Sequence, residues 1–141
     1  MATAKWATPG SSSANFAGTT LNSLANGSTS AFVTYDNSTN LDLQGAVALT
    51  LGSIVSTAGA TITLRVYAAA GGATPDDTGS VGGGDVYTMP VTVGTSAKSV
   101  VFPLVRLYPF SMRMQITNNT GVALAASGNS IVVQPFNESI V

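Results

Sequence analysis

The feature that most constrains this chain is an alternation of apolar and polar residues with a period of two. Over residues 41–51, Leu, Leu, Gly, Val, Leu and Leu share one parity, which includes Leu41 and Leu43, while Asp, Gln, Ala, Ala and Thr share the other. Residues 61–67 and 110–117 repeat the pattern. Because successive side chains of a strand point to opposite faces of a sheet, we expect each segment to form a strand with one buried face.

Shorter strands are predicted at 29–35, 86–93, 98–105, 121–126 and 129–135. Between the strands lie clusters of Gly, Asn, Asp and Ser, which favour tight turns. Helix signals are weak and allow at most one short turn within residues 19–26. Seven or eight short strands at a spacing of roughly ten residues are typical of an antiparallel sandwich or jelly roll. We therefore expect an all-β fold, a single antiparallel β-sandwich that is jelly-roll-like.

The ends of the sequence and one internal segment differ from this pattern. Residues 1–15 are rich in Ala, Ser, Thr and Gly around a lone Trp6, and they predict an extended N-terminal arm. Residues 16–141 are expected to form the β-sandwich domain. The Gly- and Asp-rich segment 68–84 is the one long irregular stretch, and we expect it to project from one end of the sandwich. Whether it binds anything is left open.

Charged residues are unusually scarce. They make up 8% of the 141 residues, against roughly 25% in an ordinary soluble domain, whereas 45% are hydrophobic and the net charge is −1. A surface with so little charge is poorly protected against association. This composition favours a chain that works in contact with a partner or with its own copies, and a neutral extracellular monomer is the alternative.

The residue types argue against catalysis. The chain has no His and no Cys, so neither a Ser-His-Asp nor a Cys-His arrangement can form within it. We expect no enzymatic activity, no catalytic residue and no cofactor. Asp76, Asp77 and Asp85 lie close together in the sequence, but their spacing matches no calcium-loop signature, and we expect no metal site there.

Nucleic acid and membrane are also not expected as partners. The basic residues are scattered singly, as Lys5, Arg65, Lys98, Arg106 and Arg113, and so provide no basic footprint for nucleic acid. No stretch approaches the about 18 apolar residues of a membrane helix. The first residues lack the apolar region of a signal peptide, so we expect the protein to be made in the cytoplasm.

Aromatic residues are the candidates for partner contact, because they bury a large area for little loss of entropy. These candidates are Trp6, Tyr35, Tyr67, Tyr87 and Tyr108, and the four tyrosines are expected to be exposed. For Trp6 two interpretations stay open, a ring folded over its own core edge or one inserted into a neighbouring subunit. For each tyrosine, packing at the rim of the sandwich is the alternative to partner contact.

Several segments resemble a known family. They are residues 6–9, 21–26, 36–43, 64–67, 116–130 and 135–139. Together they span most of the chain and resemble a family of short virion proteins from tailed phages. Members of this family are capsid decoration (cement) proteins or other minor head and tail components with a jelly-roll-like fold. The shared segments are turns and strands, so they carry no active site.

The resemblance implies a role in the virion. It predicts a capsid decoration protein that stabilises the head by contacts with the major capsid protein and with its own copies, as a dimer or trimer around a symmetry axis. Its place would be the capsid surface, after synthesis in the host cytoplasm. Two alternatives stay open, a tail, fibre or baseplate component and a carbohydrate-binding module displayed on the virion. Copy number and glycan binding distinguish them.

Overall fold

The computed structural model describes residues 4–6, 14–68 and 84–140. The described part contains ten strands and one 3₁₀ helix. The elements are β1 (Ala4–Trp6), β2 (Ala14–Ala17), η1 (Gly18–Leu21), β3 (Val33–Asp36), β4 (Gln44–Leu51), β5 (Thr61–Ala68), β6 (Asp85–Pro90), β7 (Lys98–Arg106), β8 (Ser111–Asn119), β9 (Ser130–Phe136) and β10 (Glu138–Ile140). The expected short turn within residues 19–26 corresponds to η1, which begins one residue earlier and ends at Leu21.

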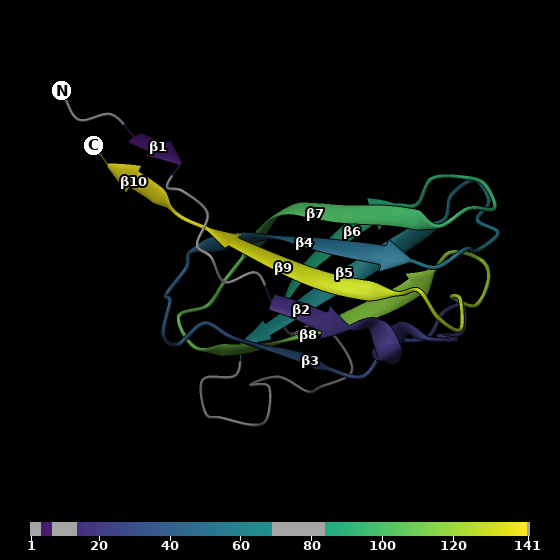
Figure 1. The fold of residues 1–141 in the computed structure, drawn as a ribbon, viewed down its shortest axis with the longest axis horizontal. Coiled ribbons are helices and arrows are strands. Elements are labelled where there is room, and N and C mark those ends of the chain that lie inside the picture. The colour runs from purple at the N-terminus through teal and green to yellow at the C-terminus, as the bar shows by residue number, and fades with distance from the viewer. Residues whose placement is uncertain (1–3, 7–13, 69–83, 141) are drawn as a thin grey trace.

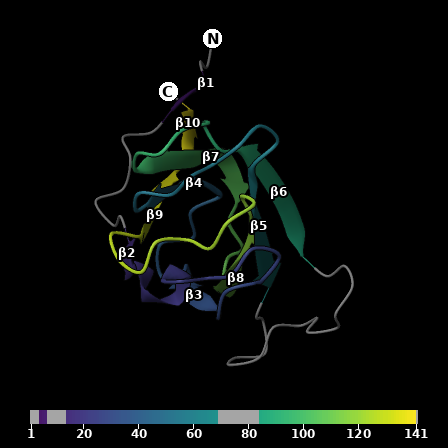
Figure 2. The same cartoon turned by 90° about the vertical axis from the view of Figure 1, so that its right-hand side faces the viewer.

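Eight of the strands form two four-stranded antiparallel sheets that pack face to face (Figures 1 and 2). The strand order is β2-β9-β4-β7 in one sheet and β3-β8-β5-β6 in the other. Strands that are adjacent in the sequence therefore mostly alternate between the sheets, which is the connectivity of a jelly roll. The predicted all-β, jelly-roll-like sandwich is confirmed.

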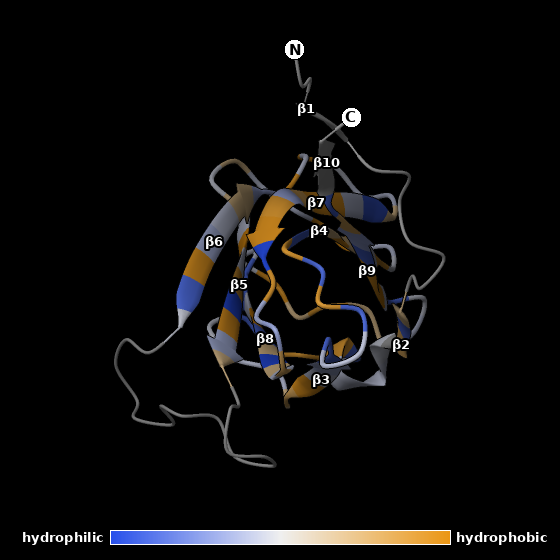
Figure 3. Cartoon of the chain, turned by 90° about the vertical axis from the view of Figure 1, so that its left-hand side faces the viewer, coloured by the Kyte–Doolittle hydropathy of each residue, from blue (hydrophilic) through white to orange (hydrophobic). Residues whose placement is uncertain are grey.

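The core lies between the two sheets and is built from one parity of each strand. Figure 3 shows hydrophobic and hydrophilic residues alternating along the strands. In β4, β5 and β8 the inward residues are fully or almost fully buried, namely Val47, Leu49, Leu51, Ile62, Leu64, Val66, Met112, Met114 and Ile116. The alternation in the sequence thus identified the buried face of all three long strands.

The prediction for residues 41–51 is wrong at its N-terminal end. Leu41 is 54% exposed and Leu43 is 64% exposed, and β4 begins only at Gln44. The preceding loop folds back on itself, because the N–H of Leu41 donates to the carbonyl of Asn37 over 3.0 Å and Leu41 has a φ of 53°. The pleat that places alternate residues in the core therefore starts after these two leucines.

A second expectation, a strand at residues 121–126, is also wrong. The segment is irregular, and its backbone is bound by a buried side chain instead of a neighbouring strand. Asn118 is fully buried, and its side-chain amide donates to the carbonyls of Leu24 and Val122, each over 2.8 Å. Its Oδ1 accepts from the N–H and the hydroxyl of Thr120 over 3.0 and 2.8 Å. Asn118 therefore organises the loops at its end of the sandwich.

The chain termini form a separate small element. β1 and β10 pair with each other, and Figure 1 shows this two-stranded ribbon projecting beyond one end of the sandwich. Of the expected arm, residues 14 and 15 belong to β2 and pair with β9 at the sheet edge. Within the segment 68–84, residues 69–83 lie outside the described residues.

No helix in the described part of the chain combines the length and the hydrophobicity needed to cross a bilayer.

The position of the core predicts a strong contrast between two identical substitutions. Leu64→Ala empties a fully buried site between the sheets, and we expect it to lower the free energy of unfolding by about 2–5 kcal/mol. Leu41→Ala removes the same atoms from an exposed site and should change the unfolding free energy by less than about 0.5 kcal/mol. Urea denaturation followed by fluorescence measures both, and equal losses would contradict the assigned core.

Candidate protein-interaction surface

The outer faces of the two sheets differ sharply in chemistry. On the sheet β2-β9-β4-β7, the outward positions of β4, β7 and β9 are mainly small or apolar, and we call this surface the apolar face. Its apolar members are Ala46, Ala48, Val101, Pro103, Leu104 and Val132. Arg106 is the one charged residue at the outward positions of its four described strands.

The outer face of the sheet β3-β8-β5-β6 is polar. It carries Arg65 and Arg113 among threonines, and hydroxyls of neighbouring strands bond across it. Thr63 and Thr88 lie 3.0 Å apart between their Oγ1 atoms. The polar groups of this surface form hydrogen bonds with one another and with water. The apolar face has few polar groups, so burying it breaks few hydrogen bonds to water. The apolar face is therefore the better candidate for burial against another protein.

A β-bulge shapes one end of the apolar face. The register between β4 and β7 shifts between Gly45 and Val47, so that Pro103 and Leu104 both lie opposite Ala46. Pro103 has no N–H for the ladder, and it is tolerated here because β7 is an edge strand. The extra residue reverses the parity of the strand. It exposes Leu104 to 55% and returns Val105 to the core.

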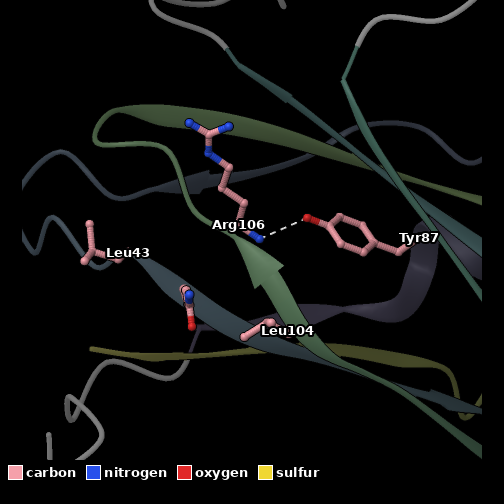
Figure 4. Close-up of a pocket in the computed structure, with 5 residues that line it drawn as sticks. Leu43, Tyr87, Leu104 and Arg106 are labelled. Carbon is pink, nitrogen blue, oxygen red and sulfur yellow. Dashed lines mark hydrogen bonds between the residues drawn. The ribbon is translucent and has the colours of Figure 1, made fainter. Parts of the chain in front are cut away.

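Beside the bulge lies a hollow of about 350 Å³, which we call the Arg106 hollow (Figure 4). It is lined by Leu43, Gln44, Tyr87, Leu104 and Arg106. The two leucines supply apolar surface, and Arg106 supplies a positive charge. The Oε1 atom of Gln44 is buried and finds no hydrogen-bond partner among the described residues. The hollow thus offers apolar surface and a positive charge to a ligand.

Hydrogen bonds on both sides of Leu43 fix its position in the hollow. Its N–H donates to Oδ1 of Asn137 over 2.8 Å, and its carbonyl accepts from the N–H of Leu107 over 3.1 Å. Behind it, the fully buried Asn37 accepts from the N–H of Asp42 and donates to the carbonyls of Asp42 and Tyr108. The leucine is therefore held at the surface by a rigid polar network, not left there by a mobile loop.

Two of the predicted contact tyrosines meet at the Arg106 hollow. The hydroxyl of Tyr87 accepts the backbone N–H of Arg106 over 3.0 Å and so links the edges of the two sheets. The ring of Tyr108 lies 5.3 Å from the guanidinium carbon of Arg106, within the range of a cation–π contact. Its hydroxyl donates to Oδ2 of Asp85 over 3.2 Å. Both rings are half-buried, which suits a supporting position beneath a partner.

The other predicted contact residues lie elsewhere. Tyr67 is on the polar outer face, where its ring meets Phe32 edge-on at 5.8 Å and Phe32 in turn lies under Arg113. The backbone of Trp6 is in β1, opposite Glu138 of β10. Tyr67 in β5 and Trp6 in β1 therefore lie on other elements than the tyrosines of the hollow.

The expectation of an exposed ring is wrong for Tyr35. This residue is 4% exposed, because it lies on the inward parity of β3. Its hydroxyl is buried and has no hydrogen-bond partner in the part of the chain that the structure describes. Burial raises the pKa of Tyr35 above its ordinary value of 10.0, and the negative charges of Asp42 and Asp36 raise it further. The ring therefore belongs to the core and not to a contact surface.

The described residues contain no group of three or more His, Cys, Asp or Glu side chains that could hold a metal ion. Of the three aspartates that were weighed as calcium ligands, Asp76 and Asp77 lie outside the described residues. The carboxylate of Asp85 accepts the hydroxyl of Tyr108.

The residues that define the hollow were not among the sequence candidates. Leu43 was expected in the core, and Arg106 stood out only as one of the scattered basic residues. The signal that was available is Pro103 inside an otherwise regular strand, because a proline there marks an edge strand or a bulge. A bulge implies that the buried parity changes at this point and that a hydrophobic residue is exposed.

Comparison of the chain with protein-family models, with curated proteins and with solved structures finds no match.

The buried hydroxyl of Tyr35 yields a prediction. Tyr35→Phe removes a polar atom that has no partner, so at neutral pH we expect the free energy of unfolding to stay constant or to rise by up to about 1–2 kcal/mol. Because the folded-state pKa is raised, the ionisation of this hydroxyl takes no stability from the fold below about pH 10, but the protein loses stability as the pH rises above that value. The variant should therefore lose less stability in alkali than the wild type does.

Denaturation curves at neutral pH and above pH 10 test this, with Tyr67→Phe on the polar outer face as the matched control. A loss of more than about 1 kcal/mol in Tyr35→Phe at neutral pH would mean that the hydroxyl has a partner.

Proposed function

We propose that this chain is a capsid decoration (cement) protein of a tailed phage, which attaches to the head through its apolar face. It is made in the host cytoplasm and then stabilises the capsid surface through contacts with the major capsid protein and with its own copies. The observation that carries the proposal is the contrast between the apolar face, with Arg106 as its charged residue, and the polar outer face with Arg65 and Arg113.

Three general features support this assignment. The sequence resembles short virion proteins of tailed phages. Jelly rolls are a common architecture of viral structural proteins, although lectin domains use them as well. A face with little charge can pack against another protein at low desolvation cost, since few ions have to leave water.

The size of the apolar face indicates how it would be used. Its three strands, about 4.8 Å apart and each roughly eight residues long at about 3.3 Å per residue, present about 380 Å². A standard interface buries about 800 Å² per partner. The apolar face alone would therefore give a weak contact, and firm attachment needs contacts between neighbouring copies as well, which a lattice of repeated sites provides.

A single charge in the middle of the apolar face tests the proposal. Ala48 pairs with Val101 on one side and Val132 on the other, so Ala48→Glu puts a carboxylate at the centre of this face. We expect at least a tenfold loss of occupancy on capsids that lack the protein, because the charge must be desolvated without a partner. Co-sedimentation with purified heads measures the occupancy.

Thr63→Glu is the matched control, since Thr63 lies on a central strand of the opposite sheet and faces outward. It should bind capsids like the wild type, and both variants should keep the wild-type unfolding midpoint. Full occupancy of Ala48→Glu would contradict attachment through the apolar face.

The same particles separate the alternative roles. Hundreds of copies per virion on the head support decoration, whereas a few dozen at one end would assign the chain to the tail, fibre or baseplate. Glycan binding that is lost in Tyr87→Ala would instead favour a carbohydrate-binding module, because Tyr87 is the aromatic side chain in the lining of the Arg106 hollow.

A further inference from the structure

Two of the chain's five basic residues lie at the centre of the polar outer face. Arg113 of β8 is paired with Tyr67 of β5, and Arg65 of β5 is paired with Gln115 of β8. The two arginines are therefore diagonal neighbours on the central strands of this sheet, with their Cα atoms about 7–8 Å apart. Like charges at this separation repel one another, and an acidic group bound between them replaces the repulsion by attraction. The pair is therefore suited to bind an acid.

Aromatic rings hold one of these arginines in place. The guanidinium carbon of Arg113 lies 5.4 Å from the centroid of the Phe32 ring, and this ring meets that of Tyr67 edge-on at 5.8 Å. The cation–π contact restrains the long side chain of Arg113, so less entropy is lost when its N–H donors bind a carboxylate. Both rings are half-buried and keep part of their surface exposed, which offers apolar contact to the C–H groups of a ligand.

A row of threonines crosses the sheet beside the arginines. Neighbouring members are paired in the register, in the order Thr29, Thr117, Thr63 and Thr88. The Oγ1 atoms lie 3.0 Å apart in the first pair, Thr29 and Thr117, and also in the last pair, Thr63 and Thr88. A hydroxyl has one donor and two acceptor positions, so two hydroxyls that share one hydrogen bond can still donate to and accept from a ligand. The row therefore offers hydrogen bonds to the hydroxyls of a ligand.

These groups together fit an acidic saccharide better than a protein or a nucleic acid. A sugar ring that carries a carboxylate brings hydroxyls for the threonines, C–H groups for the aromatic rings and an acid for the arginines. A protein partner would be expected to cover an apolar centre. On the described strands of this face, however, Val86 is the one large hydrophobic residue that is at least half exposed. Nucleic acid is held mainly by cations on its many phosphates, and this face has two.

We propose that the polar outer face binds an acidic polysaccharide. A carboxylate of the polymer lies between Arg65 and Arg113, its sugar ring rests against Tyr67, and the sugar hydroxyls bond with the threonine row. This inference goes beyond the proposed function. The two outer faces lie on opposite sides of the sandwich (Figure 2), so a chain that is attached to a head by its apolar face presents the arginines to the surroundings.

An NMR titration of the isotopically labelled full chain tests the site. The probe is an oligogalacturonate, which carries a carboxylate on each sugar ring. We expect a Kd between about 10 µM and about 1 mM, because ion pairs at a surface each contribute little. The chemical shifts that change should belong mainly to β5 and β8, and the Kd should rise with ionic strength. A neutral malto-oligosaccharide of the same length should bind at least about tenfold more weakly, since it has no group for the arginines.

Substitutions assign the binding to individual side chains. Arg65→Gln and Arg113→Gln should each raise the Kd at least about threefold, and the double variant at least about tenfold. Tyr67→Ala removes the ring and should raise the Kd at least about twofold. Arg106→Gln makes the same change as the arginine variants at the end of the apolar face, so it is the matched control and should leave the Kd unchanged. The spectrum of each free variant checks that the sheets are intact.

Several results would overturn the proposal. A wild-type chain that does not bind the oligogalacturonate at about 5 mM would do so, and so would a folded double variant that binds like the wild type. Equal affinity for the malto-oligosaccharide would show that the arginines do not contribute. Equal affinity for an oligothymidylate of the same charge would mean that the face attracts any polyanion. A loss of binding in Arg106→Gln would place the site at the Arg106 hollow instead.

The two proposals fail independently of one another. The double variant of Arg65 and Arg113 should still occupy capsids, and Ala48→Glu should still bind the oligogalacturonate. If the wild-type chain binds the oligogalacturonate but no capsid, decoration fails and the saccharide site stands. If it occupies capsids but does not bind the oligogalacturonate, the saccharide site fails and decoration stands.

Discussion

The structure depends on burying one face of each sheet against the other. The inward side chains of β4, β5 and β8, such as Leu49, Leu64 and Met114, have almost no exposed surface. No disulfide supports the fold, since the chain has no Cys. The two sheets are therefore held by apolar contact, and every other feature has to be compatible with that contact. The register of each strand is set by it, because a slip of one residue would turn the whole core face outward.

Two buried asparagines extend this constraint to the ends of the sandwich. Asn37 and Asn118 are both fully buried, and each satisfies backbone groups of loops that no strand can pair. Each side chain offers donors and an acceptor at one point, which a loop with irregular backbone requires. The hydrogen bonds of Asn37 also support the loop that carries Leu43. The shape of the Arg106 hollow therefore depends on this buried asparagine as well.

The distribution of charge connects the fold to association. The few charged residues do not lie evenly on the surface, because Arg65 and Arg113 are on the polar outer face while Arg106 stands at the end of the apolar face. A cation at the edge of an apolar surface can orient a partner that carries an opposite charge, whereas apolar area alone gives a non-specific contact. The proposed attachment through the apolar face uses both properties, the apolar area for burial and the cation for orientation.

The sequence by itself determined the β class, the sandwich and most strand positions, because a period of two is a local property that neighbouring residues report directly. It did not determine where this pattern stops. Leu41 and Leu43 continue the alternation in the sequence, but both are exposed because they precede the strand. Nor did it place Tyr35 in the core. Only the tertiary structure brought Gln44, Tyr87 and Arg106 to one corner, since a bulge and the meeting of two sheet edges depend on contacts between distant segments.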